Sequence, residues 1–264
     1  MTMSVKDVLI TGGTRNTGFG ISKAFAAKGY RLHITGRKLS AVEAAAEKIK
    51  TEFPGTEVYP YVLEMSSVAN IREVFAEIKE NSGKLDVLVA NAGHLGVDLD
   101  IYNTDEALYD AVMDVNAKGN FFCCQEAAKL MKNGGGSIVL ISSVQSKGAV
   151  EGRTVYGMSK AALNMLGKML AFDLAPYNIR CNTLIVGAVH SDRWDILDEE
   201  TAARRRSAYP LKRESDVEDI ANAVLYFAED TSKMVTGAEL VVDSGLLVPI
   251  LPYRDRKQWE RDDF

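Results

Sequence analysis

The stretch "VLITGGTRNTGFGISKAFAAKG", residues 8–29, decides the fold expected of this chain. Its apolar start predicts a buried strand, a glycine-rich turn follows, and the residues from Gly20 onward have the apolar spacing of a helix. Glycines let a backbone approach a pyrophosphate, and the free N–H groups of a helix start attract its charge. The stretch predicts a dinucleotide-binding unit, although a tight connection without a ligand gives the same pattern.

The alternation of strand and helix continues along the chain. Further apolar runs, "LHIT", "VYPYVL", "LDVLVA", "SIVLIS", "IRCNTLIV" and "AELVVD", begin at residues 32, 58, 85, 137, 179 and 238. Helical patterns occupy residues 42–50, 71–79, 106–131, 161–174 and 217–228. This order predicts an α/β fold: one doubly wound (Rossmann) domain, residues 1–250, with a parallel seven-stranded sheet and helices on both faces.

Two stretches depart from this rhythm. Residues 190–215, "HSDRWDILDEETAARRRSAYPLKRES", are highly charged, and residues 251–264 form a charged, aromatic C-terminal tail. We expect both stretches to be mobile or to contact a partner. The tail also allows the alternative of a frayed terminus.

Composition excludes several classes of function. A net charge of −5 over 264 residues gives no general attraction to nucleic acid or to anionic membranes. The start of the chain, "MTMSVKDVLITGG", has too short an apolar run for a signal peptide or a membrane span, which predicts a cytoplasmic protein. The 3 cysteines and 3 histidines show no disulfide framework and no metal-ligand spacing, so no metal is expected.

The end of the second expected strand, "HITGRK" at residues 33–38, bears on the choice of coenzyme. An NAD site usually has a carboxylate there for the ribose 2′-hydroxyl, whereas the 2′-phosphate of NADP needs cations. Here Gly36 and Arg37 occupy the place, and Arg15 lies in the neighbouring turn. Two guanidiniums suit a phosphate, so NADP(H) is predicted; the alternative is that both arginines point into water.

The stretch "YGMSKAALNML" places Lys160 four residues after Tyr156, on the same face of an expected helix. A neighbouring ammonium favours the phenolate and lowers the pKa of tyrosine from its ordinary value near 10, which makes Tyr156 a candidate general acid and base. Tyr253 and Lys257 repeat the spacing. They follow the last strand among charges, however, and are expected to lie on the surface.

These motifs together resemble those of the short-chain dehydrogenase/reductase family. The family's coenzyme turn, Thr-Gly-x-x-x-Gly-x-Gly, reads here Thr11, Gly12, Asn16 and Gly18, with asparagine at the middle glycine. Asparagine tolerates a left-handed backbone best after glycine. The family's Asn-Asn-Ala-Gly reads Ala90 to Gly93, its helix asparagine is Asn116, and its serine is Ser143, thirteen residues before Tyr156. Two departures are Glu64 in place of aspartate and Val186 in place of proline before Gly187.

The resemblance implies a catalytic set of Asn116, Ser143, Tyr156 and Lys160. In this set Ser143 stabilises the substrate oxygen, and Lys160 holds the nicotinamide ribose. Asn116 keeps a helix distorted around a water that completes a proton path; the alternative is a buried amide bonded to backbone. Coenzyme contacts are expected at Gly12, Thr14, Arg15, Asn16, Gly18, Arg37, Glu64, Met65, Asn91, Ala92, Gly93, Tyr156, Lys160, Gly187 and Val189.

The substrate is expected to be a medium-sized hydrophobic ketone or secondary alcohol, either like a hydroxysteroid or a 3-oxoacyl thioester. Its contacts are expected among His94, Ser143, Gln145, Tyr156 and Trp194, with Leu95, Val150 and Val189 as further pocket candidates. Arg204, Arg205 and Arg206 suggest contact with an acidic carrier, although such runs are usually solvated.

Assembly and two other functions complete the hypotheses. The family suggests a homotetramer, or a homodimer, with the helices around Asn116 and after Tyr156 packing across a two-fold axis. Met158, Met165 and Met169 of the second helix are interpreted first as core residues. The alternative functions are an NADP(H)-binding sensor or scaffold without turnover, and a lyase or epimerase on the same fold.

Overall fold

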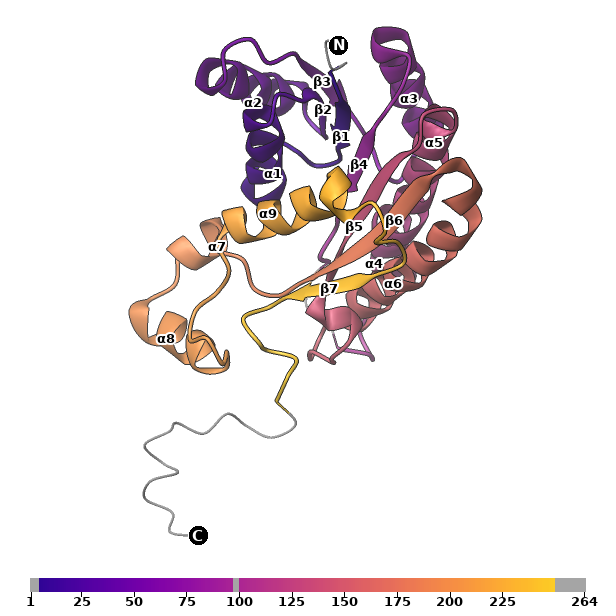
Figure 1. The fold of residues 1–264 in the computed structure, drawn as a ribbon. Helices are drawn as coiled ribbons and strands as arrows, with labels where there is room; N and C mark the ends of the chain where they lie inside the picture. The colour runs from indigo at the N-terminus through magenta and orange to yellow at the C-terminus, as the bar shows by residue number, and fades with distance from the viewer. Residues whose placement is uncertain (1–4, 97–99, 250–264) are drawn as a thin grey trace.

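The computed structural model describes residues 5–96 and 100–249, which form a seven-stranded, all-parallel sheet with the order β3-β2-β1-β4-β5-β6-β7 (Figure 1). The tail and the pair Tyr253 and Lys257 lie outside the described residues. The strands are β1 (Asp7–Ile10), β2 (Arg31–Gly36), β3 (Val58–Val62), β4 (Val87–Ala90), β5 (Gly136–Ser143), β6 (Ile179–Val186) and β7 (Glu239–Val242). The predicted doubly wound fold is confirmed.

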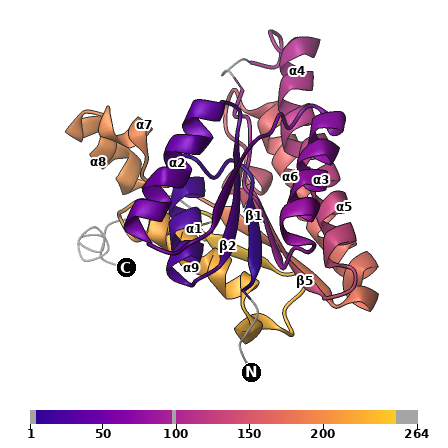
Figure 2. The same cartoon turned by 90° about the horizontal axis from the view of Figure 1, so that it is seen from above.

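Helices cover both faces of the sheet (Figure 2). One face carries α1 (Asn16–Ala27), α2 (Leu39–Glu52) and α9 (Val217–Ala228). The other carries α3 (Val68–Ser82), α5 (Asn120–Met131) and α6 (Thr154–Leu174), with α4 (Glu106–Met113) leading into α5. The central strands are apolar on both sides because each side meets a helix layer, so β1 and β4 are buried at every residue.

Successive strands are added to one side of β1 as far as β3 and to its other side from β4 onward. β1 pairs with β2 on one side and with β4 on the other, so the connections after β1 and β4 diverge. A crevice opens at such a switch point, outside the carboxyl ends of the strands, and ligands of doubly wound sheets bind there. The glycine turn after β1 and the "NAG" turn after β4 meet at this point.

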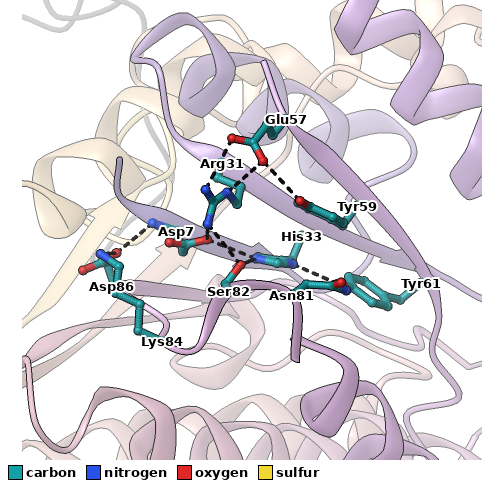
Figure 3. A network of polar contacts seen from close by, with 10 residues as sticks. All are labelled: Asp7, Arg31, His33, Glu57, Tyr59, Tyr61, Asn81, Ser82, Lys84 and Asp86. Atoms are coloured by element: carbon teal, nitrogen blue, oxygen red, sulfur yellow. Dashed lines mark hydrogen bonds and ion pairs between the residues drawn. The ribbon is translucent and has the colours of Figure 1, made fainter. Parts of the chain in front are cut away.

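A polar network closes the opposite, amino-terminal edge of the sheet (Figure 3). His33 of β2 is fully buried: its Nε2 lies 3.3 Å from Asp7 Oδ1 and 3.0 Å from Ser82 Oγ, and its Nδ1 lies 3.1 Å from the Tyr61 hydroxyl. Arg31 contacts Asp7 Oδ1 at 3.4 Å. The network ties β1, β2 and β3 to the end of α3.

Residues 190–215 are ordered into two helices, α7 (Asp192–Asp195) and α8 (Glu199–Ser207), which extend from the carboxyl edge of the sheet beside α9 (Figure 1). They enclose a small apolar cluster of Trp194, Ala202 and Tyr209. Because this stretch is highly charged, its composition did not predict that these residues are buried.

The interpretation of the methionines of α6 as core residues is wrong. Met158, Met165 and Met169 are 49%, 58% and 53% exposed, and Phe172 on the same helix is 81% exposed. At intervals of seven, four and three residues these side chains lie on one side of the helix, which we call the α6 apolar face. The described residues of the chain leave this face open.

Two negative observations concern the described residues. Between residues 5 and 249, apart from the gap at 97–99, no helix is both long and apolar enough to cross a bilayer. In the same ranges no cluster of three or more His, Cys, Asp or Glu side chains is arranged to hold a metal ion. The three cysteines are buried, and burial raises the pKa of each thiol.

Candidate active site

The turn after β1 has the backbone that its motif predicts. Gly12 and Asn16 have φ of +66° and +46°, so asparagine occupies the left-handed position where the family pattern has glycine. A Cβ on Gly18 would lie 2.1 Å from the Gly12 carbonyl oxygen and 2.7 Å from Asn91 Nδ2. Only glycine fits between these groups, and the open helix start beside it is suited to the pyrophosphate of a dinucleotide.

Arg15 and Arg37 lie on two neighbouring loops. The amide of Gly13 donates to the Thr35 carbonyl oxygen at 3.0 Å, and a Cβ on Gly36 would lie 2.9 Å from Thr14 Cγ2. The loops after β1 and β2 are therefore in contact. Both arginines are exposed, and no carboxylate of the described residues forms an ion pair with either.

The turn after β4 is joined to the first turn by hydrogen bonds. Thr11 Oγ1 accepts from the amides of Asn91 and Ala92 at 3.0 and 2.9 Å. Asn91 Nδ2 donates to the Thr11 carbonyl at 3.0 Å and lies 3.3 Å from that of Gly12. Asn91 thus holds the two halves of the crevice together, and Gly93 is exposed beside them.

The remaining coenzyme candidates occupy the ends of β3 and β6. Glu64 is exposed and its carboxylate accepts from the amide and the hydroxyl of Ser66, whereas Met65 is buried with its sulfur 3.8 Å from Cys123 Sγ. Met65 can offer a ligand only its backbone. The amide of Gly187 donates to the Val242 carbonyl, and Val189 pairs with Ser215.

Ser143, Tyr156 and Lys160 converge on one cavity of about 270 Å³ at the carboxyl edge of the sheet. Ser143 ends β5, while Tyr156 and Lys160 lie on the first turns of α6, which packs along that strand. The cavity is lined by Thr17, Asn91, Gly93, Leu95, Ile141, Ser142, Ser143, Tyr156, Lys160, Val186 and Gly187. A coenzyme turn and a proton-transfer pair thus share one hollow.

Lys160 is buried beside Tyr156. Its Nζ lies 5.7 Å from the centroid of the Tyr156 ring and donates to the Ile141 carbonyl oxygen at 2.8 Å. Burial lowers the pKa of this ammonium to about 8, because a charged group loses its hydration inside the protein. Near neutral pH the group is a cation beside a phenol, which stabilises the phenolate.

Ser143 is oriented by the chain that follows it. Its Oγ accepts from the amide of Gln145 at 3.2 Å, at the start of a 3-10 turn, Val144–Ser146. Because the hydroxyl accepts from the backbone, its own hydrogen can be donated to an oxygen in the cavity. Such a donor suits a substrate carbonyl that gains negative charge.

Asn116 lies in a π-helical turn, Asp114–Gly119, between α4 and α5. Its Oδ1 accepts from the amide of His94 at 2.6 Å, and its Nδ2 donates to the His94 carbonyl and to Ser159 Oγ at 2.8 and 2.9 Å. Ser159 in turn donates to the Tyr156 carbonyl at 2.7 Å. The helix is distorted at this residue, and its amide is also bonded to backbone, so both interpretations of Asn116 describe part of its setting.

Comparisons with known proteins agree with this geometry. A family model described as enoyl-(acyl carrier protein) reductase matches residues 12–247. A 3alpha-hydroxysteroid dehydrogenase of Mediterraneibacter gnavus is 34% identical over 92% of this chain and 97% of its own. The 3-oxoacyl-(acyl-carrier-protein) reductase FabG of Thermotoga maritima is 34% identical over 94% of this chain and 100% of its own. The chain belongs to the short-chain dehydrogenase/reductase family.

Two solved structures support the same assignment at the level of the fold. A short-chain type dehydrogenase/reductase from Mycobacterium marinum has a TM-score of 0.86 at 26% identity, over 94% of this chain and 97% of that one. YwfH, described as an NADPH dependent reductase involved in bacilysin biosynthesis, has a TM-score of 0.88 at 25% identity, over 94% of this chain and 100% of that one. This short-chain dehydrogenase/reductase is an oxidoreductase of a family that uses NAD(H) or NADP(H) and acts on CH–OH groups.

Some of the residues predicted to contact the substrate of this short-chain dehydrogenase/reductase lie at the cavity, and others do not. Leu95 lines the cavity, and His94 precedes it with its backbone held by Asn116. Gln145 Oε1 is buried near Ser143 without a partner among the described residues. Val150 is exposed and does not line the cavity.

Trp194 does not line the cavity, contrary to the prediction. Its side chain is buried in the α7–α8 cluster, stacked on His190 and covered by the guanidiniums of Arg205 and Arg206 at 5.9 and 5.6 Å from its ring. A tryptophan in a charged loop gave no sign that this loop has a core of its own.

Some lining residues were missed from the sequence. Thr17 and Val186 stand inside motifs that were used, so their place in the turn could have indicated them. Ile141 contributes a carbonyl oxygen to Lys160, and Ser142 Oγ donates to the Lys160 carbonyl at 3.1 Å. The contact of Ile141 is made by its backbone carbonyl, so the pattern of side chains in the sequence cannot predict it.

Proposed function

We propose that this protein is an NADP(H)-dependent oxidoreductase that interconverts a ketone and a secondary alcohol, with Tyr156 as the general acid and base. The observation that carries the proposal is the convergence of Ser143, Tyr156 and Lys160 on a cavity shared with the dinucleotide turn. The named relatives, a hydroxysteroid dehydrogenase and a reductase of 3-oxoacyl groups, support the same reaction class.

The residues divide the proton chemistry among them. The nicotinamide coenzyme, when bound, supplies or accepts the hydride. In reduction Tyr156 donates its proton to the substrate oxygen, and in oxidation its phenolate removes the alcohol proton. The buried ammonium of Lys160 stabilises the phenolate, and Ser143 donates a hydrogen bond to the same substrate oxygen.

The pair of exposed arginines supports NADP(H) as the coenzyme. Gly36 and Arg37 replace the carboxylate that an NAD site places after the second strand, and Arg15 lies on the adjoining loop. Guanidiniums bind a phosphate through charge-assisted hydrogen bonds, while a ribose hydroxyl gains little from them. YwfH, which is described as NADPH dependent, has a similar fold.

The coenzyme proposal is tested by binding. Arg37→Ala is expected to weaken NADPH about tenfold to a hundredfold, the usual effect of losing a hydrogen bond to a charged group, and to leave NADH nearly unchanged. Lys48→Ala, which removes an exposed cation of α2, is the control. Equal loss of both coenzymes in Arg37→Ala would instead place Arg37 away from the 2′-phosphate.

The substrate is proposed to be a medium-sized hydrophobic carbonyl compound, either like a hydroxysteroid or a 3-oxoacyl thioester. A second hollow beside Tyr156 has a volume of only about 10 Å³ and is lined by Leu95, Leu108, Val112 and Val155 together with Thr104, Arg153 and Thr154. The apolar side chains there, rather than the volume of the hollow, support an apolar group next to the reacting carbonyl. Of the three arginines proposed for an acidic carrier, Arg206 is already paired with Glu214 at 2.8 Å, which weighs against the carrier.

The deciding experiment follows NADPH oxidation by absorbance against 3-oxoacyl thioesters, hydroxysteroid ketones, sugars and small diketones, with NADH in parallel. Turnover of one class supports the proposal and names the substrate family. Tight NADPH binding without turnover favours the sensor or scaffold. Conversion of a substrate without net NADPH consumption favours a lyase or epimerase.

A homotetramer or homodimer is proposed as the assembly. The α6 apolar face, with Met165, Met169 and Phe172, and Phe121 of α5 offer exposed apolar side chains on neighbouring helices. Phe172→Glu is expected to shift the mass measured by light scattering toward the monomer, and Lys48→Glu on α2, which covers the other face of the sheet, is the control. An unchanged mass in Phe172→Glu would remove α6 from the interface.

A further inference from the structure

His190 bridges two carboxylates in the connection after β6. Its Nδ1 lies 3.0 Å from Glu214 Oε1, and its Nε2 lies 2.9 Å from Asp195 Oδ1. Asp195 is the last residue of α7, and Glu214 precedes α9. One imidazole thus joins two segments that are nineteen residues apart in the sequence.

The two partners determine the protonation state of this ring. Ionised carboxylates only accept hydrogen bonds, and a neutral imidazole has a single N–H to donate. Both contacts are therefore hydrogen bonds only when the ring is the imidazolium, with an N–H on each nitrogen. A neutral ring would keep one bond and turn a lone pair toward the other carboxylate.

The neighbouring groups keep Glu214 ionised and hold its carboxylate in place. Arg206 of α8 donates to both of its oxygens, from Nε at 2.8 Å and Nη2 at 2.9 Å. These bonds, followed by the bond to His190, lower the pKa of Glu214 to about 2 in spite of its burial. Asp195 is 64% exposed and can turn to water, so it is the partner that a neutral His190 would lose.

The bridge lies between the α7–α8 segment and the wall of the cavity. The His190 amide donates to the Ser215 carbonyl at 2.8 Å, and the Ser215 amide donates to the Ala188 carbonyl at 3.0 Å. Gly187, the next residue back, lines the cavity. On the other side His190 stacks on Trp194, whose ring centroid lies 6.5 Å away.

We propose that His190, as the imidazolium, is a positioning residue that holds α7 and the cluster around Trp194 against the residues that follow β6, and so sets the cavity wall for substrate. The effect on substrate rests on the proposed function, whereas the holding of α7 does not. The charged groups that face the ring are Asp195 on α7, Glu214 before α9 and, through Glu214, Arg206 on α8; Arg205 faces the other partner, Trp194.

The pH dependence has a definite direction. Hydrogen bonds to Glu214 and then Asp195 raise the pKa of His190 above its ordinary value of about 6.5. For a base with a raised pKa, the stabilisation is complete below the ordinary value and is lost as pH rises through the raised one. The bridge is therefore complete in mildly acidic solution and opens on the alkaline side.

The holding of α7 is tested by tryptophan fluorescence in Trp259→Phe, which leaves Trp194 as the single tryptophan of the chain. An imidazolium stacked on an indole quenches it more strongly than a neutral imidazole does. The emission of Trp194 is expected to rise with pH through one titration, with its midpoint above 6.5. Asp195→Asn is expected to lower that midpoint, and Asp192→Asn, which removes an exposed charge of the same helix, is expected to leave it unchanged.

The effect on the cavity is tested by KM, measured from pH 6 to pH 9 with a substrate found in the panel. In the wild type KM is expected to rise about threefold to tenfold across the titration, the usual scale for one exposed charge-assisted hydrogen bond. His190→Gln, which is neutral throughout, is expected to have the raised KM at every pH. The ratio of the KM values of the two proteins is free of the pH dependence that both share through Lys160.

The outcomes separate the two proposals. No titration of Trp194, or the same titration in His190→Gln, overturns the bridge whether or not turnover is found. A titration with a constant ratio of KM between wild type and His190→Gln overturns the role of His190 in positioning the cavity wall. A titration lost in His190→Gln, in a protein that turns over no substrate, supports the holding of α7 and counts against the proposed function alone.

Discussion

Lys160 combines burial and charge in one side chain. The residue is 4% exposed, and its ammonium has only the Ile141 carbonyl as a hydrogen-bond acceptor among the described groups. A cation in such a place is costly to the folded state, and its depressed pKa of about 8 expresses this cost. The low dielectric constant around this buried ammonium also strengthens its electrostatic effect on the phenol of Tyr156.

The pH profile of the free enzyme is expected to report Lys160. Below about pH 8 the ammonium stabilises the Tyr156 phenolate, and above that value it becomes neutral and this stabilisation is lost. We expect kcat/KM to fall as pH rises through about 8, because kcat/KM follows the ionisations of the free enzyme. Lys160→Met should lose turnover at every pH and unfold at an equal or higher urea concentration, since an apolar side chain replaces a buried charge. A Lys160→Met protein that is much less stable would contradict the costly-charge argument.

Tyr156→Phe removes one oxygen and nothing else from the catalytic set. Turnover is expected to fall by about a hundredfold to ten-thousandfold, the usual contribution of a positioned proton donor, while NADPH binding changes little. Tyr253→Phe, at the second tyrosine that precedes a lysine by four residues, is the matched control and should keep the wild-type rate. Comparable rates in wild type and Tyr156→Phe would refute the assignment.

At the scale of the element, the connection from α4 to α5 shows what local patterns leave out. Residues 106–131 have the periodicity of a single helix, and the structure divides them at the π-helical turn. The turn is held by distant partners: Asn116 bonds the backbone of His94, and Asn120 Nδ2 lies 3.3 Å from the Ala92 carbonyl. Since these contacts join separate parts of the sequence, apolar spacing cannot predict them.

Gly119 ends the π-helical turn against the strand-end loop after β3. A Cβ there would lie 2.3 Å from the Met65 carbonyl oxygen, a backbone atom with little freedom to move. Gly119→Ala is expected to lower the free energy of unfolding in urea by about 1–3 kcal/mol, the range for an overfilled core. Gly134→Ala, where the added methyl meets no atom within 4 Å, should change it by less than about 0.5 kcal/mol. Equal effects would show that the Met65 carbonyl moves aside.

The candidate site divides in the same way between what was predictable and what was not. Asn16 was predictable as the left-handed residue of the first turn because turn chemistry is local, and its φ is +46°. The positions of Tyr156 and Lys160 on one helical face were likewise predictable from their spacing. Trp194 was not, because its burial depends on how α7, α8 and Leu246 meet in three dimensions.

At the scale of the whole molecule, the two edges of the sheet differ in character. The carboxyl ends of β1, β4, β5 and β6 surround the cavity, whereas the amino ends of β1 and β2 hold the polar network of Asp7, Arg31 and His33. The parallel sheet with helices on both faces was predictable from the alternation of strand and helix, whereas the strand order came from the structure. The network was not predictable, because an isolated histidine in an apolar strand carries no sign of its partners.

Asp7 is expected to stabilise the fold in a pH-dependent way. Its burial raises its pKa, but hydrogen bonds with His33 and Ser82 and the charge of Arg31 together lower it below the ordinary value. The stabilisation is therefore present above about pH 4 and is lost as pH falls through the depressed pKa. Asp7→Asn should lower the free energy of unfolding by about 3 kcal/mol at pH 7. The difference in this free energy between wild type and Asp7→Asn should become smaller toward pH 3.

Asp230→Asn is the control for this measurement. Asp230 is 87% exposed and pairs with Lys6 at 3.4 Å, so its loss should cost less than about 1 kcal/mol. A difference between Asp7→Asn and wild type that stays constant from pH 7 to pH 3 would show that the carboxylate charge of Asp7 does not stabilise the fold.

The placement of that network at the amino ends has a consequence for how the protein tolerates change. A substitution at Asp7 or His33 weakens the scaffold without touching the cavity, whose lining at the carboxyl ends of the strands includes neither residue. A ligand that binds only the folded state raises the stability of such variants. A mutant library screened with saturating coenzyme should therefore contain folded variants of this edge that unfold when the coenzyme is absent. Variants at Tyr156 would not be recovered. A screen run with and without coenzyme would therefore distinguish mutations that impair folding, at the amino ends of the strands, from mutations that impair catalysis, at their carboxyl ends.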